Sequence, residues 1–153
     1  MAAPITLSAR IGTNRAQIFK ALTESRGLAS FWTTDSVAEP KEGSVAVLSF
    51  GRARLEMKVD ELDEAKRVAW TCVNDFPMDP YCWEGTTVTW SLDEQDGDQT
   101  TVLLEHGNWP TDLSQSAVAS TAFNWALILK ALKSYVETGE PQPVFGLADA
   151  SVA

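Results

Sequence analysis

Hydrophobic and polar residues alternate along several short stretches of the chain, which is the pattern of strands with one buried face. In the segment 5–11 every second residue is apolar, and Leu55, Met57 and Val59 repeat this period within 54–62. The same reasoning predicts strands at 44–50, 68–73, 83–92 and 100–106. Because short turns join the successive strands, the pattern predicts an antiparallel meander.

Apolar residues recur at helical spacing in three other places. Short helices are predicted around Ile18 and Leu22 and again at 28–32, with Asn14 available as a cap for the first. From 112 to 138 the chain has no glycine or proline, and a helix of this length is roughly 40 Å long. Gly139 and Pro141 are typical residues for ending it.

These elements predict an α+β fold with one domain at 4–143 and a frayed C-terminal tail at 144–153. In this fold a curved six-stranded antiparallel sheet wraps around the long C-terminal helix, and the two short helices lie between strands 1 and 2. A single helix is about 10 Å wide, which is too narrow to cover such a sheet. Large side chains or a ligand must fill the remaining space.

The chain has six tryptophans and six phenylalanines, which either pack the core or border a wide apolar pocket. We expect a pocket for a small hydrophobic or aromatic ligand. The residues expected to line it are Trp32, Phe50, Met57, Trp70, Trp90, His106, Phe123 and Leu127.

Composition and charge narrow the classes of partner. The apolar share of 44% is that of a globular protein. A net charge of −9 repels phosphate backbones and argues against nucleic-acid binding. No apolar run approaches the ~20 residues of a membrane-spanning helix, and the first residues lack the pattern of a secretory signal. We therefore expect a cytoplasmic protein that does not act at a membrane.

His106 is the only histidine and shares the strand parity of Val102 and Leu104, so it is predicted to face the interior. It could be a general base oriented by a carboxylate such as Glu84, a ligand contact, or a hydrogen-bonded structural residue. Cys72 fits a core strand and Cys82 a loop, and their pairing stays open.

Other templates for chemistry are missing from the sequence. There is no Gly-x-Ser-x-Gly elbow, no glycine-rich phosphate loop and no cysteine–histidine spacing for a metal. We accordingly expect no catalytic residue, no metal and no cofactor, and favour binding over turnover. The loop 75–82 is rich in apolar groups, with Phe76, Met78 and Tyr81. It fits a pocket lid or a subunit contact, or a loop folded onto its own core.

Five segments, read in order, resemble a known superfamily. They are IFKALT at 18–23, LASFW at 28–32, WEGTTVTW at 83–90, TTVLLEHGNW at 100–109, and the closing stretch at 124–140. Together they resemble the START/Bet v 1-like (SRPBCC) superfamily. The branch they are similar to is named for the C-terminal domain of the activator of heat-shock-protein-90 ATPase (AHSA-type).

The resemblance implies a helix-grip fold and allows three kinds of activity. The first is binding of a small hydrophobic ligand in an internal cavity. The second is an enzyme of the cyclase/dehydratase kind that uses His106. The third is a co-chaperone-like protein-interaction module that acts through its surface on a chaperone client. A homodimer through the loop 76–81 or an edge strand is compatible with each of them.

Overall fold

The computed structural model describes residues 2–76, 82–96 and 98–146. One antiparallel sheet has the strand order β1-β7-β6-β5-β4-β3-β2, and three helices accompany it. In chain order the elements are β1 (Ile5–Ile11), α1 (Arg15–Thr23), α2 (Ser25–Phe31), β2 (Asp35–Val37), β3 (Val45–Phe50), β4 (Ala53–Asp63), β5 (Arg67–Cys72), β6 (Thr87–Gln95), β7 (Gln99–Gly107) and α3 (Gln115–Thr138).

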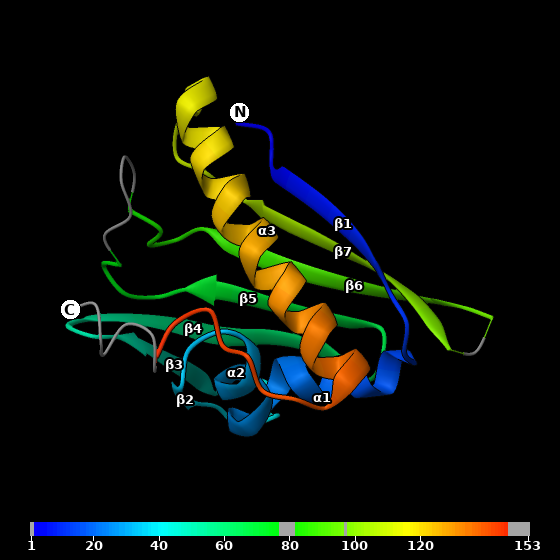
Figure 1. Cartoon of the computed structure of the whole chain (residues 1–153). Helices are drawn as coiled ribbons and strands as arrows, with labels where there is room; N and C mark the ends of the chain where they lie inside the picture. The colour runs from blue at the N-terminus through cyan, green and yellow to red at the C-terminus, as the bar shows by residue number, and fades with distance from the viewer. Residues whose placement is uncertain (1, 77–81, 97, 147–153) are drawn as a thin grey trace.

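The long helix α3 lies diagonally across one face of the sheet, and α1 and α2 lie at one end of it (Figure 1). The side chain of Ser114 caps the start of α3 by accepting from the amide of Ala117. Gly139 ends the helix in the left-handed conformation, with φ 80°. The predicted α+β helix-grip fold is confirmed.

The sheet has seven strands rather than the predicted six, because β2 was not anticipated. This strand has only three residues and pairs with β3 from Asp35–Ser49 to Val37–Val47. Its two outer residues are exposed, and Val37 is 62% exposed. A strand this short gives no periodic signal that would separate it from a loop.

The predicted strand 83–92 begins later, at Thr87. Residues 83–86 form a turn instead, in which the amide and the hydroxyl of Thr86 both donate to the carbonyl of Trp83. Gly85 has φ 83°, which a glycine adopts without strain. The turn places Trp83 beside the end of the sheet rather than within it.

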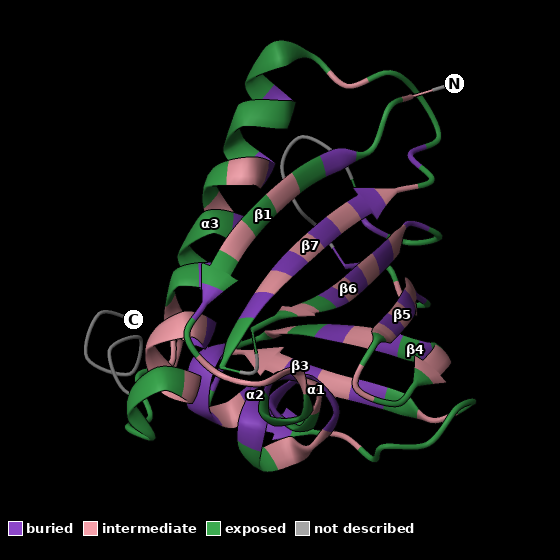
Figure 2. Ribbon diagram, turned by 90° about the vertical axis from the view of Figure 1, so that its right-hand side faces the viewer, coloured by how far each residue is buried: buried purple, intermediate pink, exposed green. Residues whose placement is uncertain are grey.

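Buried and exposed residues alternate along the strands, as Figure 2 shows. The buried residues of β6 and β7 point toward the helix side of the sheet. They are Val88, Trp90 and Leu92 of β6 and Val102 and Leu104 of β7. The outward surface of α3 is exposed. The core therefore lies between the sheet and α3.

The chain beyond α3 is ordered differently from the expected frayed tail. Residues 139–146, here named the C-terminal strap, run back along α2. The amide of Gln142 donates to the carbonyl of Ser30, that of Val144 to Phe31, and that of Phe145 to Trp32. Backbone hydrogen bonds of this kind fix Phe145 against the body of the protein. Residues 147–153 lie outside the described part of the chain.

Among the described helices, none combines the length and apolar character needed to cross a membrane.

Candidate functional site

An aromatic cluster occupies the core between α3 and the sheet, with Trp125 at its centre. The Trp125 ring stacks on Trp83 at 5.6 Å with planes 15° apart. It meets Trp32 at 5.3 Å and Trp90 at 5.8 Å in edge-to-face contacts. These are the separations at which aromatic pairs attract one another, so ring–ring packing stabilises Trp125 in the core.

At one margin of this cluster the packing leaves an apolar cavity of about 330 Å³. It lies where the start of β4 and the end of β3 approach α3 and the C-terminal strap. Its lining consists of Trp32, Phe50, Ala53, Leu55, Phe76, Trp83, Asn124, Ile128 and Phe145. Volumes of about 300–1,000 Å³ are usual for small-molecule sites, so this one suits a compact guest.

Of the eight residues expected in the pocket, Trp32 and Phe50 line the cavity. Met57, Trp70, Trp90 and His106 are buried on the interior side of the sheet, but the cavity lining does not include them. The Trp70 ring lies 6.1 Å behind Trp32. Two of the four contact rings of the lining, since Trp70 lies against Trp32 and His106 against Trp83.

Phe123 and Leu127 were expected to face the interior, and this prediction is wrong. Phe123 is 64% exposed and Leu127 is 40% exposed on the outer surface of α3. Each lies two positions from Trp125, which is about 200° around a helix with 3.6 residues per turn. Since Trp125 is fully buried, both side chains must point to the opposite side.

Several cavity residues were missed by sequence reasoning. Asn124 and Ile128 are one helical turn apart on α3, on the same side of the buried Trp125. Sequence reasoning missed Asn124 because its side chain is polar. Phe145 was missed because it follows Pro143 in a segment without any periodic pattern. Its ring meets Phe50 edge-to-face at 5.1 Å and closes one side of the cavity.

The loop 75–82 is described only at its ends. Phe76, which was a candidate for an exposed patch, is buried and lies 5.5 Å from Trp83. Residues 77–81, which include Met78 and Tyr81, lie outside the described residues. Of the alternatives considered for this loop, Phe76 therefore fits a loop folded onto its own core.

His106 is fully buried, and both of its ring nitrogens are engaged. The Trp125 indole N–H donates to Nδ1 over 3.0 Å. Because an indole nitrogen can only donate, Nδ1 must accept, and Nε2 carries the proton. Nε2 then donates to the Thr86 hydroxyl over 2.8 Å, and that hydroxyl donates to the carbonyl of Trp83. The chain of bonds links α3, β7 and the turn before β6.

Burial lowers the pKa of His106 from 6.5 to about 3. The ring is consequently neutral near pH 7. Glu84, the carboxylate considered as its orienting partner, is exposed, while Thr86 occupies the hydrogen-bonding position beside Nε2. Among the three roles considered for His106, the geometry fits the hydrogen-bonded structural one.

Cys72 and Cys82 are free thiols. Burial raises the pKa of Cys72. A hydrogen bond to Asp75, with Sγ 3.0 Å from the carboxylate oxygen, raises that of Cys82. Reactive cysteines have lowered pKa values, so neither thiol is an activated nucleophile. Within the described residues, no group of three or more histidine, cysteine, aspartate and glutamate side chains is arranged to hold a metal ion.

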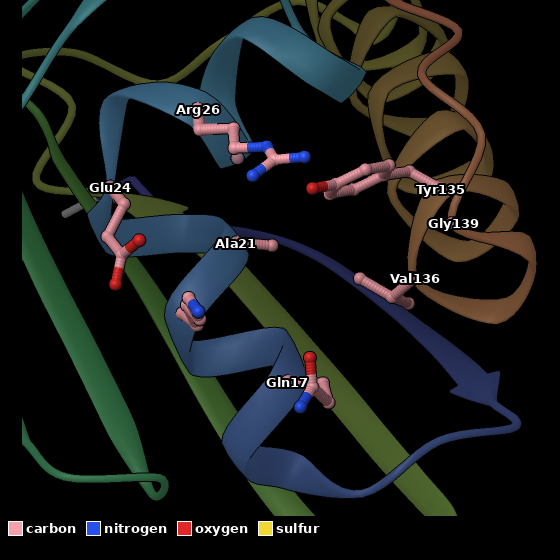
Figure 3. Close-up of a pocket in the computed structure, with 9 residues that line it drawn as sticks. Gln17, Ala21, Glu24, Arg26, Tyr135, Val136 and Gly139 are labelled. Atoms are coloured by element: carbon pink, nitrogen blue, oxygen red, sulfur yellow. The ribbon is translucent and has the colours of Figure 1, made fainter.

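A second hollow of about 290 Å³ lies between α1, α2 and the end of α3, and its lining is polar. Figure 3 shows the Arg26 guanidinium and the Tyr135 hydroxyl directed toward each other across it, while the carboxylate of Glu24 points away from them. The negative end of the α3 dipole lies at the same place and offsets the positive charge of Arg26.

Comparison with known proteins gives a family and a set of structural relatives. The family described as Activator of Hsp90 ATPase homolog 1-like protein matches residues 12–137. The Aha1 dimer from Colwellia psychrerythraea, solved in solution, is 29% identical with a TM-score of 0.77, and the match covers 89% of this chain and 97% of that one. No curated protein matches the sequence.

Two more distant structures share the fold. DynU16, a protein of the dynemicin biosynthetic locus, is 19% identical with a TM-score of 0.75, and the match covers 95% of this chain and 51% of that one. CalU16 from Micromonospora echinospora is 18% identical with a TM-score of 0.66, and the match covers 92% of this chain and 77% of that one. At such low identity the likeness concerns architecture alone.

Proposed function

The chain belongs to the family of Activator of Hsp90 ATPase homolog 1-like proteins, as its sequence motifs predicted, and we propose that it binds a small hydrophobic or aromatic ligand in its apolar cavity. The observation that carries the proposal is the 330 Å³ space bordered by Trp32, Phe50 and Trp83. Family membership supports a ligand-binding fold, and function itself is argued from the site.

The chemistry of the lining supports an aromatic guest. Five of the side chains named in the lining are aromatic, namely Trp32, Phe50, Phe76, Trp83 and Phe145. Aromatic walls favour a planar guest, because offset and edge-to-face ring contacts add about 0.5–1.5 kcal/mol beyond the burial of apolar area. With its pKa near 3, the neutral His106 behind the wall adds no charge that would oppose an apolar guest.

The test is a titration of the ¹⁵N-labelled protein with naphthalene, followed through the six tryptophan indole N–H signals. We expect the signals of Trp32 and Trp83, which line the cavity, to shift most. Ala53→Phe fills the cavity and should abolish the shifts. Ala69→Phe is a matched control, because Ala69 alternates with the buried Val68 and Trp70 and so faces the other side of the sheet. Naphthalene shifts that survive in the Ala53→Phe variant would overturn the proposal.

A second candidate, self-association through α3, is favoured by a separate observation. The outer surface of this helix exposes Phe123 and Leu127, which are one turn apart, at 64% and 40%. Exposed apolar side chains gathered on one helix face mark contact surfaces, and the Colwellia relative is described as a dimer. Sedimentation equilibrium should then give a dimer that Phe123→Ser converts to a monomer. A wild-type protein that stays monomeric at millimolar concentration would exclude this candidate.

A further inference from the structure

We infer that Asn124 selects the ligand of the apolar cavity, and that this ligand is an uncharged aromatic molecule carrying one hydrogen-bonding group. The inference rests on the proposed function and makes it more specific. It starts from the composition of the lining, in which, among the described residues, Asn124 is the one amide beside eight residues with apolar or aromatic side chains.

Asn124 lies on the cavity side of α3, where its amide can reach a guest. It is half-buried on α3, between the exposed Phe123 and the buried Trp125, and one turn before Ile128 on the cavity side. Within the described residues, its side-chain amide has no hydrogen-bond partner. Because Asn124 is half-buried, water can pair with its amide in the free protein, and a hydrogen-bonding group of the guest can replace that water.

An amide side chain carries both a donor and an acceptor. It can therefore receive a hydroxyl, a carbonyl or a carboxamide of the ligand, and each of these is neutral. A charged group fits less well, because no lining residue in the described part of the chain carries a charge that could compensate it. Moving an uncompensated carboxylate out of water into apolar surroundings is strongly unfavourable.

The experiment compares three probes of one shape, namely naphthalene, 2-naphthol and 2-naphthoate, on the wild-type protein and on Asn124→Leu. Leucine has nearly the size of asparagine without its donor and acceptor. We expect the affinity ratio of 2-naphthol to naphthalene to fall about fivefold in Asn124→Leu, which is the usual net effect of one hydrogen bond. On the wild type, 2-naphthoate should bind at least tenfold more weakly than 2-naphthol, as roughly expected for an unpaired charge in apolar surroundings.

A matched control is Ser120→Leu, which adds the same side chain at an exposed position one turn earlier on α3. It should leave all three affinities unchanged. The role of Asn124 is overturned if the affinity ratio of 2-naphthol to naphthalene is unchanged in Asn124→Leu. It is also overturned if the wild type binds 2-naphthoate more tightly than 2-naphthol. In either case the proposed function stands as long as naphthalene binds. If neither naphthalene nor 2-naphthol binds the wild type, the proposed function fails and this inference fails with it.

Discussion

At the scale of single residues, His106 holds the most connected position in the core. Its backbone carbonyl accepts from the Trp109 indole over 2.9 Å, and its ring is bonded to Trp125 and Thr86. The ring lies edge-on to Trp83 at 4.6 Å and near Trp109 at 4.3 Å. A neutral imidazole satisfies this network, whereas an imidazolium would turn Nδ1 into a donor facing the donor of Trp125.

This network makes folding stability depend on pH. The folded-state pKa of His106, about 3, lies below the ordinary 6.5. As the pH falls from 6.5 toward 3, the unfolded chain takes up a proton that the folded state excludes, so stability is present above pH 6.5 and decreases below it. The loss approaches ~1.4 kcal/mol per pH unit. Chemical denaturation between pH 7 and pH 5 should show a decrease of about 2 kcal/mol.

The control is His106→Gln, which keeps a donor and an acceptor but does not titrate. This variant should be less stable than the wild type at pH 7, yet its stability should change much less between pH 7 and pH 5. A wild-type slope retained in the variant would show that another group titrates. Glu137 does not interfere in this range, since Lys133 and the amide of Gly12 lower its pKa from 4.5.

At the scale of elements, the sequence predicts the long strands and helices because each repeats its period several times. In β4, Leu55, Met57 and Val59 are all buried, as the alternation predicts. Short segments held by tertiary contacts lack such repetition. The strand β2 is bonded to β3 along three residues, and the C-terminal strap is fixed by hydrogen bonds to α2. The local sequence of each segment does not predict these contacts, because the partners are distant in the chain.

The strap gives a prediction of its own, because Phe145 forms one side of the cavity. Phe145→Ala should weaken naphthalene binding about fivefold, as expected for the loss of one aromatic contact of ~1 kcal/mol. It should lower the free energy of unfolding by only about 1–2 kcal/mol, below the 3–5 kcal/mol usual for a fully buried phenylalanine, because Phe145 is half-buried.

Val144→Ala is the matched variant for this measurement. Val144 is also half-buried in the strap but is not part of the lining. It should lose stability without losing affinity for naphthalene. Equal losses of affinity in the two variants would mean that the strap acts through general stability rather than as a wall.

At the scale of the whole molecule, the sheet is continuous from β1 to β2, and α3 crosses it. We propose that 4–143 form one folding unit, and expect one cooperative thermal transition. Far-ultraviolet circular dichroism, which follows the helices, and tryptophan fluorescence, which follows the core, should give the same midpoint. Two separate midpoints would contradict a single unit.

That aromatic side chains fill the space between the helix and the sheet could be predicted from the sequence, but the place where a hollow remains could not. A sheet wider than the helix requires filling, and the aromatic residues supply most of it by packing on one another, as Trp125 does with Trp83. What stays empty is the margin that this packing does not reach. The position of that margin depends on which face α3 turns toward the sheet, on the turn that positions Trp83, and on the path of the C-terminal strap to Phe145. Each of these is set by tertiary contacts.

The ring contacts from Trp70 through Trp32 and Trp125 to Trp83 have a spectroscopic consequence. Excitation energy transfers efficiently between indoles at these distances, so light absorbed by one tryptophan can be emitted by its neighbour. A quenching guest that touches Trp32 or Trp83 would then dim the emission of the connected rings as well. Tryptophan fluorescence should therefore report occupancy of the cavity more strongly than the two lining indoles alone would.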